Sequence, residues 1–237
     1  GQVIDDITHW WFERTESTVP NHCIDRPAKT ITVADECRPL KVELVVRAYL
    51  TGTSSTSIWT AYQRGDRSFC GYALPEGMKK DQILPHLMIT PSTKAEKGEH
   101  DISIDHEQAK SLLPGTENER GHLWQQVQSI SLALFRRGES LAKDIGLILV
   151  DTKYEMGLDS ENRILLIDEI HTPDSSRFWE SELYEQCFAA GEDPIPLSKQ
   201  FVRDAVIAKG YEPKKGGKVP MLDDNDRVNC AALYIML

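Results

Sequence analysis

Residues 149–157 read LVDTKYEMG, residues 158–163 read LDSENR, and residues 164–179 read ILLIDEIHTPDSSRFW. The first and third stretches are rich in β-branched and aliphatic residues, and the middle one is typical of a turn, so we predict a β-hairpin. Because side chains alternate between the two faces of a strand, Asp151, Lys153 and Glu155 share one face. Asp168 can lie opposite them on the second strand. Three carboxylates and one ammonium group would then converge on a small area.

This concentration of charge predicts a metal site beside an anion site. Crowded carboxylates repel one another unless a cation neutralises them, and Mg²⁺ prefers oxygen ligands while keeping waters and a substrate phosphate in its shell. The second strand runs into residues 172–177, where backbone N–H groups, hydroxyls and a guanidinium suit a phosphate. From the pattern alone, an exposed hairpin with a charged solvent face is an equally open alternative.

Composition sets the class of protein. A chain of 237 residues can form one large domain or two small ones, and its 40% hydrophobic and 27% charged content is ordinary for a globular protein. No apolar run approaches the ~20 residues that span a bilayer, and the first residues do not form a signal peptide. A net charge of −10 disfavours nucleic acid as a partner but still allows a local cationic pocket.

Cysteine usage favours a reducing, cytoplasmic location. The five cysteines are odd in number and scattered, and none forms a CxxC pair, which argues against a disulfide framework or a zinc site. Six histidines also lack ligand spacing and are expected to have no chemical role: His9, His22, His86, His106, His122 and His171.

Periodicity predicts the remaining elements. Helices are expected over residues 4–18, 118–145, about 180–190 and 198–209, with a last one from Asp223 or Asp224. Strands are expected over residues 29–33 and 40–49. Residues 51–82 should be mostly loop with one short helix near Ser57–Tyr62, and the polar residues 89–101 should form an active-site loop. Within the long helix, Trp124 and Phe135 are expected in the core.

Five stretches together resemble one enzyme family, phosphoribosylaminoimidazole-succinocarboxamide synthase (SAICAR synthetase). They are LILVDTKYEMG at 147–157, LLIDEIHTPDSSRFW at 165–179, VVRAYLTGT at 45–53, TPSTKAEKGEHD at 90–101 and KQFVRD at 199–204. They occur in the family's order and span most of the chain. The resemblance implies an α+β fold with antiparallel sheets and flanking helices, and a nucleotide domain related to kinase and ATP-grasp folds.

The resemblance also implies the reaction. Members join 5-amino-4-carboxyimidazole ribonucleotide (CAIR) and L-aspartate in purine biosynthesis, using ATP and Mg²⁺ and passing through an acyl phosphate. Two alternatives stay open: a Mg²⁺-dependent small-molecule kinase without an amine acceptor, and an inactive, truncated binding module. A homo-oligomer is a further expectation.

Roles for individual residues follow from the same resemblance. Glu155 and Asp168 are expected to contact Mg²⁺, and Lys153 a phosphoryl oxygen. Asp151 is expected to orient Lys153 or a substrate amino group, and Asp174 completes this catalytic set, although its position favours shaping the turn through an Asx-type hydrogen bond. The ribonucleotide phosphate is assigned to Arg47, Thr53, Ser176, Arg177 and Arg203. The aspartate or the imidazole carboxylate is assigned to Lys94, His100 and Asp101.

The chain departs from the family at its beginning. Members start with a strand-turn-strand segment that covers ATP and carries Gly-Lys-Val-Arg-Asp-like and Asp-Arg-Ile-Ser-Ala-Phe-Asp-like motifs, and neither motif is present. We therefore expect residues 1–41 to be the remnant of an N-terminal ATP-binding subdomain, residues 42–195 a central catalytic domain, and residues 196–237 a C-terminal helical segment. The adenine would contact backbone near Ala34–Leu40, where no side chain identifies itself. Met156 and Thr53, where the family often has Phe and Ser, are mild departures.

Overall fold

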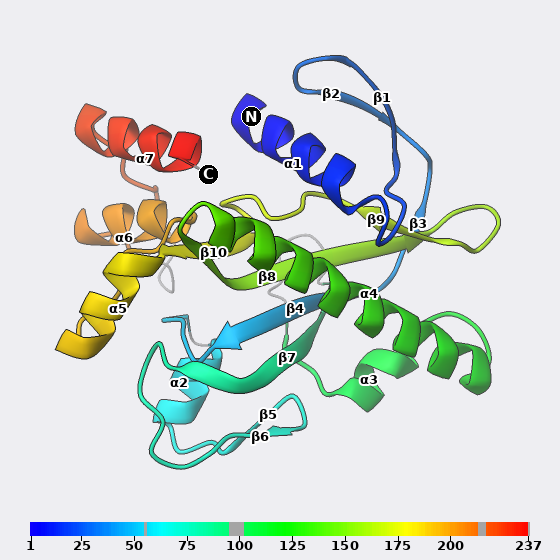
Figure 1. Cartoon of the computed structure of the whole chain (residues 1–237), viewed down its shortest axis with the longest axis horizontal. Coiled ribbons are helices and arrows are strands. Elements are labelled where there is room, and N and C mark those ends of the chain that lie inside the picture. Colours follow the sequence, from blue (N-terminus) through cyan, green and yellow to red (C-terminus); the bar gives the residue numbers. More distant parts are fainter. Residues whose placement is uncertain (55, 95–101, 213–216, 237) are drawn as a thin grey trace.

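The computed structural model describes residues 1–54, 56–94, 102–212 and 217–236. A central antiparallel sheet has the strand order β10-β8-β4-β7 and is built from Ser176–Glu180, Leu147–Leu158, Val42–Tyr49 and Ile83–Thr93. Two short strands, β3 (Arg38–Pro39) and β9 (Ile164–Ile167), also pair with β8. The long helix α4 (Glu117–Asp144) crosses one face of this sheet (Figure 1).

Smaller elements surround the sheet. The helices are α1 (Gln2–Thr15), α2 (Ile58–Gln63), α3 (His106–Ser111), α5 (Ser181–Ala190), α6 (Gln200–Ala208) and α7 (Asp224–Met236). Two hairpins are separate from the central sheet: β1–β2 (Cys23–Ala28 and Ile31–Ala34) and β5–β6 (Ser68–Phe69 and Tyr72–Ala73). Both ends of the chain lie on the same side of the molecule, where α1 and α7 are neighbours (Figure 1). Within the described residues, no helix is long and apolar enough to cross a membrane.

The predicted hairpin is confirmed, with one correction. Strands β8 and β9 pair antiparallel, with Glu155 opposite Ile167. Asp168 lies one residue beyond β9 and has a left-handed backbone, with φ of 63°, so the prediction that it belongs to the second strand is wrong. An aspartate tolerates this conformation better than most residues, and the resulting bend turns its carboxylate toward β8.

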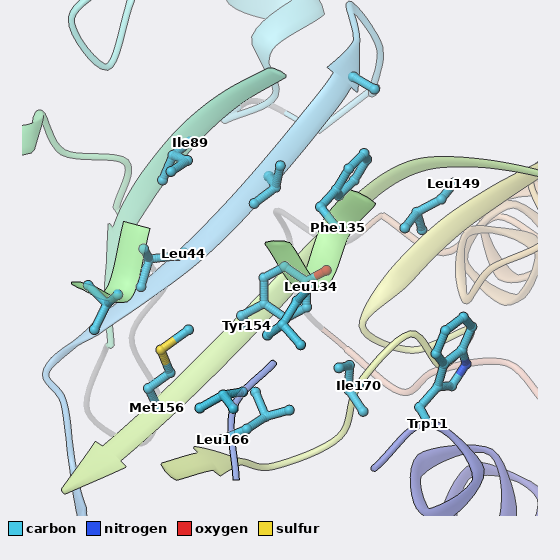
Figure 2. Close-up of a cluster of buried hydrophobic side chains, with 14 of the residues drawn as sticks. Trp11, Leu44, Ile89, Leu134, Phe135, Leu149, Tyr154, Met156, Leu166 and Ile170 are labelled. Carbon is cyan, nitrogen blue, oxygen red and sulfur yellow. The ribbon is translucent and has the colours of Figure 1, made fainter. Parts of the chain in front are cut away.

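Helix α4 is confirmed within one residue at either end. Its N-cap Thr116 forms a capping box with Glu119, which satisfies two otherwise unpaired backbone donors. Its buried stripe includes Trp124, Leu134 and Phe135, the last two with no exposed surface. Figure 2 shows Leu134 and Phe135 gathered with Tyr154 of β8, so one face of the sheet and this helix form the main core.

Two other predictions are wrong. The strand expected at 29–33 spans a turn, since β1 ends at Ala28, β2 begins at Ile31, and Thr30 between them has a φ of 70°. The loop expected at 89–101 begins too early, because β7 continues to Thr93 and Ile89 is buried. Residues 95–101 lie outside the described residues. The short helix near 57–62 and the helices near 180–190, 198–209 and 224 are confirmed.

A close approach between α4 and the segment after β9 depends on a glycine. His171 is 1% exposed, and its Nε2 lies 2.6 Å from the Tyr154 hydroxyl. Burial lowers the pKa of His171 to about 3, so this imidazole is neutral. A Cβ on Gly138 would lie 2.5 Å from Cε1 of His171 and 2.9 Å from a Leu149 methyl, both held in the core.

We therefore expect Gly138→Ala to destabilise the fold. The added methyl must displace the His171 ring, and overpacking of this kind costs about 1–3 kcal/mol. Gly121→Ala is the matched control on the same helix, because nothing lies within 4 Å of the point that its Cβ would occupy. That control should stabilise by about 0.5–1 kcal/mol through helix propensity. Urea unfolding of both variants measures the two free energies, and equal effects would contradict the close-packing argument.

Candidate functional site

The site lies on the face of the central sheet that α4 does not cover. On β8, Thr152 and Tyr154 point into the core, so the alternating Asp151, Lys153 and Glu155 point to the opposite face. Arg47 of β4 pairs with Asp151 across the sheet. The predicted sharing of one face is confirmed, and the polar side chains on it form two groups.

The first group is a carboxylate between two guanidinium groups. Oδ2 of Asp151 accepts from Nη1 of Arg47 at 3.3 Å and from Nη1 of Arg177 at 3.1 Å. Arg47 also donates from Nε to the Thr90 hydroxyl at 2.9 Å, which fixes the plane of its guanidinium. Because one carboxylate faces two cations, this group carries net positive charge.

The position of Asp151 corrects one expectation. The sequence predicts that this carboxylate orients Lys153 or a substrate amino group. Its ion-pair partners in the described part of the chain are both arginines, so it does not hold Lys153, and a role toward a substrate amino group stays a prediction. The three side chains are only 10–18% exposed, so Asp151 holds both guanidinium groups in a partly desolvated setting. The remaining N–H groups of the two arginines stay available for an anion.

The second group is built around Lys153. Its Nζ contacts Glu155, lies 3.3 Å from Oε1 of Glu43 and lies 3.6 Å from Oδ2 of Asp168. The other carboxylate oxygen of Glu155 accepts from Nζ of Lys94. Three carboxylates thus share two ammonium groups, so these five side chains together carry one net negative charge.

Two of the three carboxyls around Lys153, those of Glu155 and Asp168, have pKa values shifted in opposite directions. Burial raises the pKa of Glu155, but hydrogen bonds from Lys153 and Lys94 outweigh it and lower that pKa to about 2. For Asp168, burial and the adjacent Glu155 carboxylate raise the pKa above its ordinary value, and Lys153 offsets only part of this. A further cation beside Asp168 would therefore lower the electrostatic energy of the cluster.

The turn after β9 is organised by a threonine. The Thr172 hydroxyl accepts from the backbone N–H groups of Asp174 and Ser175, at 3.2 Å each. The Asx-type role expected for Asp174 is therefore wrong, and its carboxylate instead accepts from the Tyr234 hydroxyl on α7. Ser176 is 5% exposed, and its hydroxyl lies 2.7 Å from that of Thr152 on the core side of the sheet. The structure does not bring the Ser176 hydroxyl to the two arginines.

A cavity of about 210 Å³ opens beside Arg177. Its walls also include Thr53, Lys80 and Gln200, together with three acidic residues: Asp81, Asp193, which pairs with Lys80, and Asp204. Thr53 is exposed at a tight turn that requires Gly52, because Gly52 has a φ of 105° and a Cβ there would lie 2.6 Å from Cβ of Ser57. Arg177 and Thr53, which come from distant parts of the chain, thus meet at one pocket as expected.

Two further predicted residues, Arg203 and Lys94, do not line this cavity. Arg203 is exposed on α6 and donates to Oε1 of Gln200 at 3.4 Å, so it stands next to the cavity wall. Lys94 reaches the carboxylate cluster rather than this cavity. His100 and Asp101 lie outside the described residues.

Sequence reasoning missed three residues at the site. Glu43 alternates with Val45 and Arg47 along one strand, so the same period-two argument applied to β8 could have found it. Thr90 and Asp81 carried no such signal, because their partners are set by the pairing of β4 with β7 and by the bend before β7.

Comparison with known proteins decides the family. The family model described as SAICAR synthetase matches residues 1–217. Phosphoribosylaminoimidazole-succinocarboxamide synthase of Legionella pneumophila (strain Lens) is 41% identical over 237 residues, which cover 100% of this chain and 74% of that protein. The chain belongs to the SAICAR synthetase family. The expected α+β fold and the expected enzyme class, a carbon–nitrogen ligase of purine biosynthesis, are confirmed.

Solved structures of the SAICAR synthetase family show the same fold. SAICAR synthase from Saccharomyces cerevisiae, solved in complex with SAICAR, superposes with a TM-score of 0.75 at 29% identity, covering 98% of this chain and 78% of that one. A SAICAR synthetase solved in complex with ADP superposes with a TM-score of 0.65 at 20% identity, covering 93% and 82%. The second likeness concerns the fold alone.

The pKa values of Glu155 and Asp168 are shifted in opposite directions. Neutral substitutions at the two positions should therefore change the free energy of unfolding of the ligand-free protein in opposite directions. Glu155→Gln should destabilise near neutral pH by on the order of 3 kcal/mol, because a carboxyl whose pKa falls from 4.5 to about 2 stabilises the fold when ionised. Asp168→Asn should stabilise near neutral pH, because a raised pKa means that ionised Asp168 disfavours the fold.

The pH dependence of these effects has a defined sign. The deficit of Glu155→Gln should shrink as pH falls from 4.5 toward 2. The gain of Asp168→Asn should shrink as pH falls toward 3.8 and below, because the wild-type carboxyl takes up its proton at higher pH in the folded chain than in the unfolded one. Denaturation of both variants and the wild type over this range measures the differences. Loss of stability in both variants near neutral pH would contradict the assigned charges.

Proposed function

We propose that this chain catalyses the ATP-dependent joining of CAIR and L-aspartate to give SAICAR, ADP and phosphate. The proposal is supported by two groups on one sheet face, in a chain of the SAICAR synthetase family. One is Asp151 between Arg47 and Arg177, and the other is the lysine–carboxylate cluster around Lys153. The yeast relative, at 29% identity over nearly the whole chain, was solved with the product of this reaction.

The proposed chemistry has two balanced steps. A carboxylate is a poor acyl donor, so an oxygen of the imidazole carboxylate first attacks the γ-phosphorus of ATP, and ADP leaves. The amine nitrogen of aspartate then attacks the acyl carbon, inorganic phosphate leaves and the nitrogen loses its proton. Charge builds up on the transferring phosphoryl group, and fixed cations are the main means of stabilising it.

Lys153 is the residue that would contact the phosphoryl oxygens. Burial lowers the pKa of its ammonium group, but Glu155, Glu43 and Asp168 outweigh this and raise that pKa above its usual range. Lys153 therefore remains a cation throughout and acts by charge rather than by giving up a proton. Its three acidic neighbours orient the ammonium group before substrate arrives.

The donor set near Lys153 fits Mg²⁺ bound through two carboxylates. Glu155 and Asp168 offer hard oxygen ligands, and the raised pKa of Asp168 supports an added cation beside it. Among the described residues, no group of three or more acidic, histidine or cysteine side chains is arranged to enclose a metal. Mg²⁺ commonly uses one or two carboxylates and completes its shell with waters and substrate phosphates, so Glu155 and Asp168 would be enough to hold it, and it would neutralise phosphoryl charge there.

The ribonucleotide phosphate is proposed to bind at the cavity beside Arg177. Arg177 and the Thr53 turn line this cavity, Arg47 shares the Asp151 carboxylate with Arg177, and Arg203 contacts Gln200 of the cavity wall. Asp151 and Glu155 are four residues apart on an extended strand, or about 13 Å. The ribose and imidazole ring of one ribonucleotide bridge such a separation and bring the imidazole carboxylate to Lys153. Lys94, with His100 and Asp101, is proposed to contact the aspartate substrate or the imidazole carboxylate.

The ATP side is proposed for residues 1–41, with the adenine against backbone near Ala34–Leu40. This segment lies beside the end of β8, since Arg38 pairs with Leu158 and the Leu40 N–H donates to the Met156 carbonyl at 2.9 Å. An adenine there would place the triphosphate along β8 toward Glu155. Residues 42–195 then form the catalytic domain, and residues 196–237 add the helical segment that bears Arg203.

Substrate-dependent ADP release tests the proposal. We expect repeated turnover, with more than one ADP per enzyme, only when CAIR, Mg·ATP and L-aspartate are all present, with SAICAR formed in equal amount. Repeated ADP release without aspartate, with a phosphorylated product accumulating, would instead identify a small-molecule kinase. No release with any combination would support a binding module and reject the ligase.

Arg177→Ala tests the phosphate assignment. Loss of charge-assisted hydrogen bonds worth about 1.5–3 kcal/mol should raise KM for CAIR by about one to two orders of magnitude, while KM for ATP changes little. Arg177→Lys should recover only part of the affinity, because an ammonium group cannot reproduce the planar fork. Arg64→Ala removes an exposed arginine whose ion-pair partner is Asp66, and it serves as the control. An unchanged KM for CAIR in Arg177→Ala would remove Arg177 from the pocket.

A further inference from the structure

Asp81 is a buried carboxylate in the wall of the cavity beside Arg177. The residue is 4% exposed and has a left-handed backbone, with φ of 61°, at the bend that precedes β7. An acidic group would by itself repel a phosphate, so its presence in this wall needs an explanation.

The backbone of Asp81 is fixed from two sides. Its N–H donates to the carbonyl of Leu50 at 2.8 Å, and its carbonyl accepts from the Tyr184 hydroxyl at 3.0 Å. Tyr184 in turn stacks on Trp179, with ring centroids 5.0 Å apart and ring planes within 6°. The carboxylate of Asp81 therefore projects from a rigid point.

That carboxylate holds the start of the Thr51–Thr53 turn. Oδ1 of Asp81 accepts the hydrogen bond of the Thr51 hydroxyl, and Thr51 is itself only 4% exposed. Gly52 follows, packed against Ser57, and Thr53 then reaches the cavity. Because both residues before Thr53 are fixed, the position of the Thr53 hydroxyl and N–H depends on the bond between Thr51 and Asp81.

We infer that Asp81 is a positioning residue for ribonucleotide binding, which acts by holding Thr51 so that the Thr51–Thr53 turn faces Arg177. The inference rests on the proposed function for the identity of the ligand. The negative charge of Asp81 is directed at the Thr51 hydroxyl, and Lys80 and Arg177 lie beside it. Because Lys80 also pairs with Asp193, it is the Thr51 hydrogen bond and Arg177 that offset the repulsion of a bound phosphate by Asp81.

A pair of substitutions at Thr51 tests the inference. Thr51→Val keeps the shape of the side chain but removes the hydroxyl and leaves the Asp81 oxygen unpaired, whereas Thr51→Ser keeps the hydroxyl. We expect Thr51→Val to weaken CAIR binding about 5- to 20-fold in calorimetry and to raise KM for CAIR equally, with KM for ATP unchanged. Thr51→Ser should stay within about twofold of the wild type.

Asp81→Asn provides a second, independent variant. Asparagine tolerates the left-handed backbone and keeps an oxygen that accepts from Thr51, so it should bind CAIR at least as well as the wild type. Equal CAIR affinity in Thr51→Val and Thr51→Ser would overturn the inference, as would an equal rise in both KM values or a loss of thermal stability without any change in CAIR binding.

The binding measurement separates the inference from the proposed function. CAIR binding by the wild type without turnover would reject the ligase activity, while the Thr51 pair would still decide the role of Asp81. Turnover in a Thr51→Val variant with unchanged CAIR affinity would reject only the inference. A wild-type chain that binds no CAIR would overturn both.

Discussion

The alternation of side chains over residues 151–156 of β8 is the constraint on which the rest of the structure depends. It begins just after a bulge in the pairing with β10, between Leu149 and Asp151. One face of this strand is sealed against α4 by Thr152, Tyr154 and Met156, all at most 1% exposed. Its other face must then present Asp151, Lys153 and Glu155. A slip of one residue in the pairing of β8 would bury three charges in the core, so the hydrophobic face also fixes the register of the site.

The two polar groups on this face carry net charges of opposite sign, and this explains how an acidic protein can hold a nucleotide. The chain carries a net charge of −10, but Asp151 with two arginines has a local excess of positive charge. The five side chains of the Lys153 cluster carry one excess negative charge, and the pKa of Asp168 is raised there. Such partly buried charges are stable only while each has a partner. The first group is thus prepared for an anion and the second for a cation.

The parts of the fold that can be predicted from sequence are those fixed by local pattern. The long helix and the short helix near residue 58 match their predicted bounds nearly to the residue. The hairpin is confirmed, although its second strand ends before Asp168. The strand end at 89–93 escapes prediction because Pro91 is typical of a loop. Proline is tolerated here because β7 is an edge strand, with β4 as its neighbour in the sheet order. The turn at Thr30 escapes prediction because no glycine or asparagine marks its left-handed residue.

The site could be predicted as a set of residues but not as a set of contacts. The period of β8 and the family resemblance identify Asp151 and Arg177, whereas their mutual bond requires knowing that β10 lies beside β8. Similarly, the period of β4 can place Glu43 on the same face as Arg47, but its contact with Lys153 depends on the pairing of β4 with β8. Partners that lie far apart in sequence are set by strand order, which local patterns do not contain.

The segment between β9 and β10 joins the two halves of the site through one buried hydrogen bond. Asp168 begins this segment and Arg177 follows it on β10. The carboxylate cluster around Lys153 and the pair of arginines on Asp151 therefore lie at its two ends. His171 pins the middle to the Tyr154 hydroxyl, and its neutral ring fits there only because Gly138 has no side chain. The core face of β8 therefore positions Asp168 and Arg177 as well as its own charged residues, and a shift at Tyr154 would move both halves together.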